Sequence, residues 1–293
     1  MIRLATHAMG TRFEIVLPGE ESPWLRAIGE EAVREIELWH SRLTRFQPDS
    51  DVAGLNLRRT ARLDDESYEL LSLCEQVHGA TNGAFNIGLG AVMDGTARAT
   101  AVGHSPVHLD PSSRTVTLSP GAMIDLGAVG KGFALDRASQ ILREHGVTNA
   151  FLHGGTSSVV ALGKPDGADG WLITVGPDRH RLSLLLTDRC LAVSSPGGRP
   201  SSCPESDSAP HIIDPRTGAP SRGVDAAAVS GPLGSAAACD AWATALVVLG
   251  SRSDVMDHPP RFPRMLDGRV YTAAEGWQAV VGAANPTPNL CPC

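Results

Sequence analysis

Between residues 150 and 193 the sequence contains a series of short apolar runs that are separated by polar or glycine-containing turns, without a helical segment between them. Such runs predict β-strands, and strands that follow one another through short turns favour antiparallel pairing. We therefore expect strands at 150–152, 157–162, 171–175, 182–186 and 190–193. Further strands are expected at 11–17, 115–118 and 122–125, and as a pair at 211–213 and 224–230.

Segments with helical periodicity separate these groups of strands. Ser22 and Pro23 predict an N-cap and a first-turn proline for a helix that continues to about residue 43. Other helices are predicted at 66–79, at 131–145 before a stop at Gly146, and at 235–249. The segments 47–56 and 197–210 are rich in turn formers and are expected to be loops, the second being the most mobile.

The order of these elements predicts an α+β fold with mixed, largely antiparallel sheets that are flanked by helices. A doubly wound sheet would instead alternate strand and helix regularly. The length of 293 residues allows one large domain or two closely packed ones. We expect a single domain over residues 1–285, which can comprise two intertwined subdomains, and a flexible C-terminal tail over residues 286–293.

Composition excludes several classes of protein. A net charge of -7 without a Lys/Arg cluster argues against nucleic-acid binding, so any phosphate must be bound by a local site. The six cysteines lack zinc-type spacing and are expected to be mostly reduced thiols. The sequence shows neither a membrane-spanning apolar stretch nor a signal peptide, so we expect a cytoplasmic protein.

Common nucleotide-binding motifs do not fit this chain. A P-loop would need glycine in place of Asp125 and serine or threonine in place of Gly132. A dinucleotide fingerprint that starts at Gly88 and Gly90 would need a small residue in place of Met93. Phosphate chemistry must therefore use another arrangement.

Asp240 and Thr244 lie four residues apart on a predicted helix, so a carboxylate and a hydroxyl project from the same face. Such hard oxygen ligands suit Mg²⁺, which takes further ligands from water and substrate phosphates. The alternative is that Asp240 only lies near a helix start and that Thr244 fills a neutral position. The spacing alone favours this alternative, because it is common by chance.

Two other segments carry residues that phosphate chemistry would need. Residues 125–132 place a glycine-rich turn at a helix N-terminus, where backbone N–H groups favour an anion such as a pyrophosphate. Lys131 either offsets that charge or is a solvated lysine at a helix start. His211 lies before a corner with Pro215 and Gly218 that would fix the direction of its imidazole, and a lone histidine of this kind is usually a hydrogen-bonded structural residue.

Five segments in order, MGTRF, SRLTRFQPDSDVAGLN, IDLGAVGKGFALDRA, HIIDPRTGAP and CDAWATALVVLG, closely resemble the FAD:protein FMN transferases, the ApbE-like family. They extend from Met9 to Gly250. The resemblance implies an ApbE-like fold, with FAD as substrate and Mg²⁺ held by Asp240, Thr244 and the main-chain carbonyl of Gly130. It further implies that His211 acts as the base on the acceptor hydroxyl.

The resemblance also implies a flavin-binding pocket. Met9 and Phe46 match positions that press on the isoalloxazine ring, although both can instead be core residues. Three segments, at Asn86, Gly155 and Ser194, depart from the family pattern within this expected pocket. Asn86 replaces an aspartate, Gly155 precedes Thr156 where the family has aspartate, and Ser194 opens a segment where the family has Thr-Ser-Gly.

The resemblance implies transfer of FMN from FAD to a threonine or serine hydroxyl of a target flavoprotein, with release of AMP. Two alternatives remain open from the sequence. One is an FAD pyrophosphatase that uses water as acceptor and gives FMN and AMP. The other is a non-catalytic flavin-binding protein, which the changes at Asn86 and Ser194 make conceivable.

Overall fold

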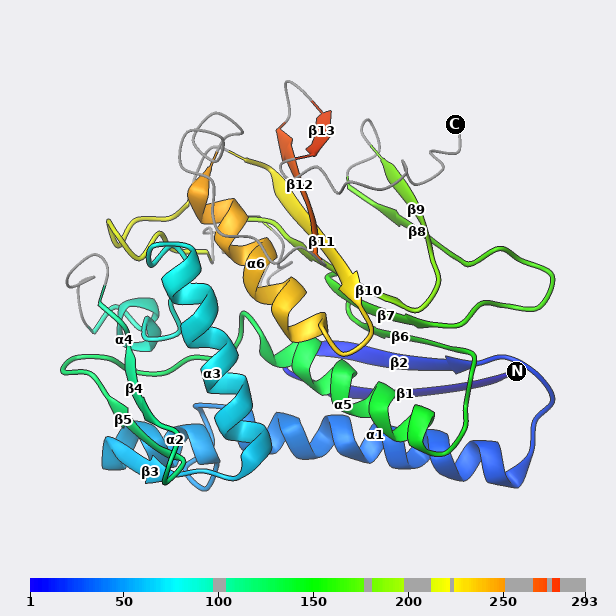
Figure 1. The fold of residues 1–293 in the computed structure, drawn as a ribbon, viewed down its shortest axis with the longest axis horizontal. Helices are drawn as coiled ribbons and strands as arrows, with labels where there is room; N and C mark the ends of the chain where they lie inside the picture. The colour runs from blue at the N-terminus through cyan, green and yellow to red at the C-terminus, as the bar shows by residue number, and fades with distance from the viewer. Residues whose placement is uncertain are drawn as a thin grey trace, which may run out of the picture.

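The computed structural model describes residues 1–96, 104–176, 181–197, 212–221, 224–250, 266–272 and 276–279. Its largest element is an eight-stranded sheet with the strand order β1-β2-β6-β7-β10-β11-β12-β13 (Figure 1). All neighbouring strands in it pair antiparallel. The strands are β1 Ile2–Ala8, β2 Thr11–Leu17, β6 Ala150–Gly154, β7 Ser158–Leu162, β10 Arg189–Ser194, β11 Ala226–Pro232, β12 Asp267–Thr272 and β13 Gly276–Ala279.

Helices cover one face of this sheet. They are α1 Pro23–Leu43, α5 Gly130–Glu144 and α6 Ala236–Leu249, which run beside the strands in Figure 1. Alternate residues of the central strands point to this face, as the two-residue period of a strand requires. Val160 and Leu162 of β7 and Cys190 and Ala192 of β10 belong to the large core that these helices complete.

The opposite face of the sheet packs against a separate two-stranded sheet. It consists of β8 Trp171–Val175 and β9 Leu182–Leu186, which pair antiparallel. Val159 and Ala161 of β7 and Leu191 of β10 join Leu184 and other residues of β9 in a second, smaller core. The central strands are therefore buried on both faces, in two different apolar environments.

The remaining described elements lie beside α6 and the end of α1 (Figure 1). They are α2 Asp51–Arg58, α3 Asp65–Ala80, α4 Gly90–Met93 and a three-stranded sheet of β3 Thr60–Arg62, β5 Thr115–Leu118 and β4 Val107–Asp110, in the order β3-β5-β4. The α+β class with largely antiparallel sheets is thus confirmed. Among the described residues, no helix combines the length and apolarity that a membrane crossing requires.

Most predicted elements are confirmed, and the corrections have identifiable causes. The predicted loop at 47–56 contains the start of α2, because Ser50 acts as its N-cap and accepts from the Ala53 N–H at 3.0 Å. The predicted strand at 122–125 is wrong: the Asn56 side chain binds both the N–H and the carbonyl of Ile124. Main-chain bonds join this segment to residues 87–90, but they form only the isolated bridge between Leu89 and Met123 and no strand.

The predicted pairing of 211–213 with 224–230 is also wrong for the residues that the structure describes. Ile213 forms only an isolated bridge to Pro220, and β11 pairs with β10 and β12. The sequence analysis did not predict β1, β3, β4, β12 or β13. Of the expected mobile loop, residues 198–210 lie outside the described part, as does the tail 286–293. The expected single domain stays a prediction.

Candidate functional site

Several turns and strand ends meet at one end of the large sheet. The β1–β2 turn contains Met9 and Gly10, and the β6–β7 turn contains Gly155, whose N–H donates to the Arg12 carbonyl at 2.8 Å. β10 ends beside the β6–β7 turn, where the Val193 N–H donates to the Ser157 carbonyl at 2.7 Å. Predicted site residues from distant segments are thus brought to the same sheet end.

Asp240 lies in α6 at this place and is almost completely buried, with 5% of its surface exposed. Its carboxylate accepts one hydrogen bond on each oxygen. The Gly132 N–H donates to Oδ2 at 2.7 Å, and the Ser158 hydroxyl donates to Oδ1 at 2.8 Å. Asp240 therefore joins the first turn of α5 to the start of β7.

The absence of a side chain at Gly132 allows α5 and α6 to approach this closely. A Cβ atom on Gly132 would lie 2.3 Å from the Ala236 carbonyl oxygen and 2.7 Å from the Ala237 nitrogen. These are backbone atoms, which cannot rotate away as a side chain can. Gly132 of the Gly-Lys-Gly sequence, which resembles part of a P-loop, thus allows α5 and α6 to pack closely. Gly130, the first glycine of this sequence, is the first residue of α5.

Burial raises the pKa of the Asp240 carboxyl, while the positive charge of Lys131 opposes this rise. Lys131 is therefore close enough to act electrostatically on the site. Among the residues that the structure describes, no lysine, arginine or histidine forms an ion pair with Asp240. The described donors that touch this carboxylate are neutral, so apart from the charge of Lys131 its negative charge is left for a cation to balance.

Thr244 lies one turn after Asp240 on α6, and its Oγ1 is 3.3 Å from the hydroxyl of Ser194. Ser194 ends β10, and the two-residue period places it on the same sheet face as Cys190 and Ala192. The structure therefore brings together Asp240, Thr244, Ser194 and the first turn of α5. Ser158, which sequence reasoning missed, belongs to this group.

The donor set of this group fits a hard divalent cation. A carboxylate and a hydroxyl at adjacent turns supply the oxygen ligands that Mg²⁺ prefers, and Mg²⁺ normally keeps several waters. In the described part of the chain, no three His, Cys, Asp or Glu side chains gather as a metal cluster. A cation here would rely on Asp240, Thr244 and main-chain or substrate oxygens rather than on a carboxylate cage.

Met9 lies beside the start of α5. Its sulfur is 3.4 Å from the position that a Cβ atom would take on Gly130. Met9 has φ 50°, a left-handed conformation that is uncommon for a residue other than glycine, and Gly10 follows with φ 71°. The Met9 N–H donates to His40 Nδ1 at 3.2 Å, which holds the two-residue turn in place. Met9 is partly buried against the core.

Phe46 is not a core residue: 74% of its surface is exposed, so the alternative that the sequence left open is wrong. Its ring lies over the Arg45 guanidinium, 4.3 Å from the carbon of that group. The Arg45 side chain is 7% exposed and pairs with Asp94 through two bonds of 2.7 Å, and also with Asp125. Arg45 thus connects the end of α1 to the loop that precedes α5.

Asn86 and Gly155 have local structural roles in addition to any binding role. The Asn86 side-chain oxygen accepts from the Gly88 N–H at 2.7 Å and closes a short turn. Gly155 has φ 63°, and a Cβ atom there would lie 2.4 Å from the Thr11 hydroxyl. His211, the predicted base, lies outside the described residues, so its place relative to Asp240 stays a prediction.

Asp136 is a second carboxylate that sequence reasoning missed. Its two oxygens accept from the N–H groups of Ala236 and Ala237, both at 2.9 Å, and so cap the first turn of α6. Burial raises the pKa of Asp136 to about 7, and the nearby Asp240 contributes to the rise. Asp136 and Arg45 both lie inside the segments that carry the family resemblance, which is the signal that could have identified them.

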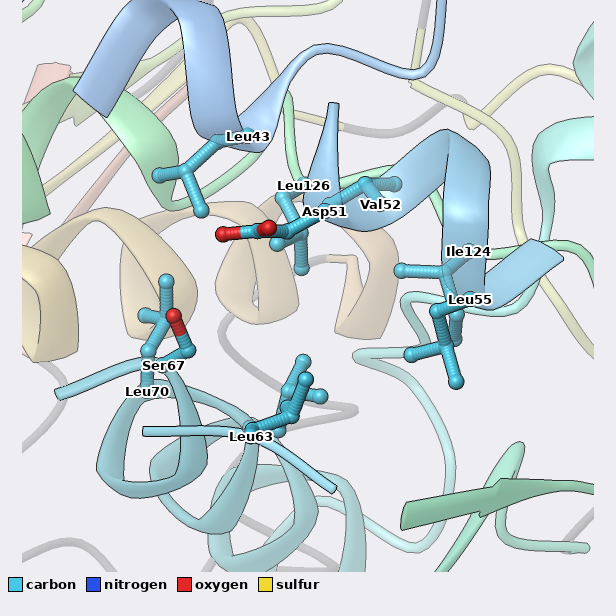
Figure 2. A pocket seen from close by; sticks show the side chains of 10 residues that line it. Leu43, Asp51, Val52, Leu55, Leu63, Ser67, Leu70, Ile124 and Leu126 are labelled. Carbon is cyan, nitrogen blue, oxygen red and sulfur yellow. The ribbon is translucent and has the colours of Figure 1, made fainter. Parts of the chain in front are cut away.

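A small apolar cavity of about 20 Å³ lies between the end of α1, α2, α3 and the loop at residues 124–126. Figure 2 shows the side chains around it, among them Leu43, Leu70 and Leu126. A volume of this size holds about one water molecule and cannot hold a dinucleotide. This cavity is therefore a packing feature.

One known protein resembles this chain in sequence, and two solved structures resemble it in fold. The FAD:protein FMN transferase of Buchnera aphidicola is 23% identical over 283 residues, which cover 85% of this chain and 80% of that protein. The ApbE protein of Thermotoga maritima has the same fold, with a TM-score of 0.80 at 24% identity, covering 95% of this chain and 96% of the other. The flavinyl transferase ApbE of Pseudomonas stutzeri gives a TM-score of 0.76 at 17% identity, covering 95% and 94%.

The sequence profile of the ApbE family matches residues 9–258, from the β1–β2 turn past the end of α6. The matched range contains each residue of the group around Asp240, and it is most of the chain. The chain therefore belongs to the ApbE family.

Proposed function

We propose that this protein transfers the FMN portion of FAD to a threonine or serine hydroxyl of a target protein, in a reaction that depends on Mg²⁺. The acceptor oxygen forms a bond to the FMN phosphorus, and the bond from that phosphorus to the bridging oxygen breaks. AMP leaves with the bridging oxygen, and the hydroxyl proton passes to His211.

The observation that carries the proposal is the buried Asp240 carboxylate, which is held by neutral donors at the meeting point of α5, α6 and β7. Thr244 and Ser194 add hydroxyl oxygens beside it. The Buchnera relative, whose name states this activity, supports the same reaction class. When bound, the cation would polarise the pyrophosphate and offset the charge that develops on its oxygens.

The proposed roles of the chain's own residues follow from their positions. Asp240, Thr244 and the Gly130 carbonyl are the proposed cation ligands, and Lys131 supplies positive charge near the pyrophosphate. Met9 and the exposed Phe46 are the proposed contacts of the isoalloxazine ring. Asn86, Gly155 and Ser194 are proposed to line the nucleotide pocket, the last two at the sheet end described above.

Purified protein incubated with FAD, Mg²⁺ and an acceptor flavoprotein tests this function. We expect flavin-labelled acceptor and an equal amount of AMP. Asp240→Asn should lower the rate at least about 100-fold, because several kcal/mol of charge stabilisation are lost. Asp166→Asn, which changes an exposed aspartate in the β7–β8 connection, is the control and should keep the wild-type rate.

The same experiment separates the alternatives. Free FMN and AMP without labelled acceptor would identify a pyrophosphatase, and FAD that stays bound and unchanged would identify a flavin-binding protein. A wild-type rate in Asp240→Asn would remove the cation assignment, whatever the product.

A further inference from the structure

Ser158 is completely buried at the start of β7, in the middle of the eight-stranded sheet. The two-residue period of β7 turns it to the same face as Val160 and Leu162, toward the helices. There its hydroxyl donates to Asp240 Oδ1 at 2.8 Å. The Ser157 hydroxyl is 3.5 Å away, which makes that second contact weak. The main bond of this buried hydroxyl is therefore the one to Asp240.

The two donors on Asp240 come from different elements, Gly132 on α5 and Ser158 on β7. One donor on each oxygen fixes the rotation of the carboxylate plane. Each carboxylate oxygen keeps a lone pair for a further partner. Because both donors are neutral, they orient the group without balancing its charge, which an arginine or lysine would do.

We propose that Ser158 is a positioning residue: its hydroxyl holds the Asp240 carboxylate in the orientation that binds the divalent cation and thereby sets the cation affinity. This inference rests on the cation site of the proposed function. Partners of this kind, which touch a ligand rather than the metal, commonly change metal affinity 10- to 100-fold when they are removed.

Titration of Mn²⁺ into the protein, with the free ion followed by its electron paramagnetic resonance signal, measures binding without turnover. We expect Ser158→Ala to weaken Mn²⁺ binding about 10- to 100-fold, with FAD present and absent. Ser157→Ala is the matched control, because its hydroxyl has no bond to Asp240, and it should bind Mn²⁺ as the wild type does. Ser158→Thr, which keeps the hydroxyl, should restore affinity to within a few-fold.

Kinetics give a second readout. In Ser158→Ala the Mg²⁺ concentration for half-maximal rate should rise by the same factor, while the rate at saturating Mg²⁺ falls much less. Wild-type Mn²⁺ affinity in Ser158→Ala would overturn the inference. Equal losses of affinity in Ser158→Ala and Ser158→Thr would also overturn it, because the effect would then come from packing rather than from the hydroxyl.

Asp240→Asn, measured alongside, separates this inference from the proposed function. If Asp240→Asn loses cation binding and Ser158→Ala does not, the cation site stands and the positioning role of Ser158 is overturned. If Asp240→Asn binds Mn²⁺ like the wild type, the cation site itself is wrong, and the inference falls with it.

Discussion

Gly132 decides how closely the two helices of the site approach each other. Its N–H reaches Asp240 only because no Cβ atom separates α5 from the backbone of Ala236 and Ala237. A helix normally loses stability at glycine relative to alanine, by about 1 kcal/mol. The contact with Asp240 and the close packing offset that cost.

Gly132→Ala should therefore destabilise the protein, by roughly 1–3 kcal/mol, because the added methyl group collides with backbone atoms. Gly79→Ala is the matched control: Gly79 lies in α3, and a Cβ atom added there would meet nothing within 4 Å, so this variant should gain up to about 1 kcal/mol. Urea denaturation measures both. A stabilised Gly132→Ala would show that α5 and α6 can separate without cost.

The pattern of single residues explains which parts of the site the sequence could predict. Asp240 and Thr244 are four residues apart, so helical periodicity alone places them on one face. Ser158 is 82 residues from its partner Asp240, and nothing in its local sequence distinguishes it from Ser157. Its role depends on sheet register and helix packing, which follow from the complete fold.

At the level of elements, two buried carboxylates join α5 to α6, one from each helix. Asp136 of α5 caps α6 through Ala236 and Ala237, while Asp240 of α6 caps α5 through Gly132. Each helix thus supplies the carboxylate that satisfies backbone N–H groups of the other. Val129 and Ser235, at the N-cap positions themselves, form no side-chain cap bond.

This reciprocal arrangement predicts a pH dependence of stability. The pKa of Asp136 is about 7 in the folded protein and about 4 in the unfolded chain, so the folded state binds more protons between these values. Stability from the neutral carboxyl is complete below about pH 4 and is lost as the pH rises through about 7. Asp136→Asn cannot titrate, so the wild type should lose about 1–4 kcal/mol relative to this variant between pH 4 and pH 8.

Urea denaturation at a series of pH values, in the presence of a chelator, measures that difference. Burial raises the pKa of Asp240 in both proteins, so that contribution is common to both, and the charge coupling between Asp240 and Asp136 is part of the difference that the experiment measures. A difference between wild type and Asp136→Asn that stays constant with pH would contradict the prediction. Asp169→Asn, which changes an exposed aspartate before β8, should show the wild-type pH profile.

Elements with strong local signals were the predictable ones. The helix at 22–43 has its cap and first-turn proline in the sequence, and the structure contains it as α1 with the Ser22 hydroxyl accepting from the Leu25 N–H at 3.1 Å. The three-residue β3 has no such signal and exists because it pairs with β5. Turn formers such as Ser50 were ambiguous, since they also cap helices.

At the level of the whole molecule, the two faces of the eight-stranded sheet have separate tasks. The helix face carries Ser158 and Ser194, which point toward Asp240 and Thr244 of α6, and the other face packs on β8 and β9. The central strands β7 and β10 contribute alternate residues to both faces. The second core should therefore stabilise the strands that carry the site without taking part in its chemistry.

Leu184→Ala tests that separation of tasks, because Leu184 is 7% exposed in the second core, whereas Leu172 on the other side of the same hairpin is 67% exposed. Leu184→Ala should cost about 2–3 kcal/mol of unfolding free energy, and the matched Leu172→Ala less than about 0.5 kcal/mol. Both variants should bind Mn²⁺ with wild-type affinity below their unfolding temperatures, because neither side chain belongs to the group around Asp240. If Leu184→Ala instead weakened Mn²⁺ binding as strongly as Ser158→Ala, the orientation of Asp240 would depend on packing across the sheet, and the two faces would form one coupled unit.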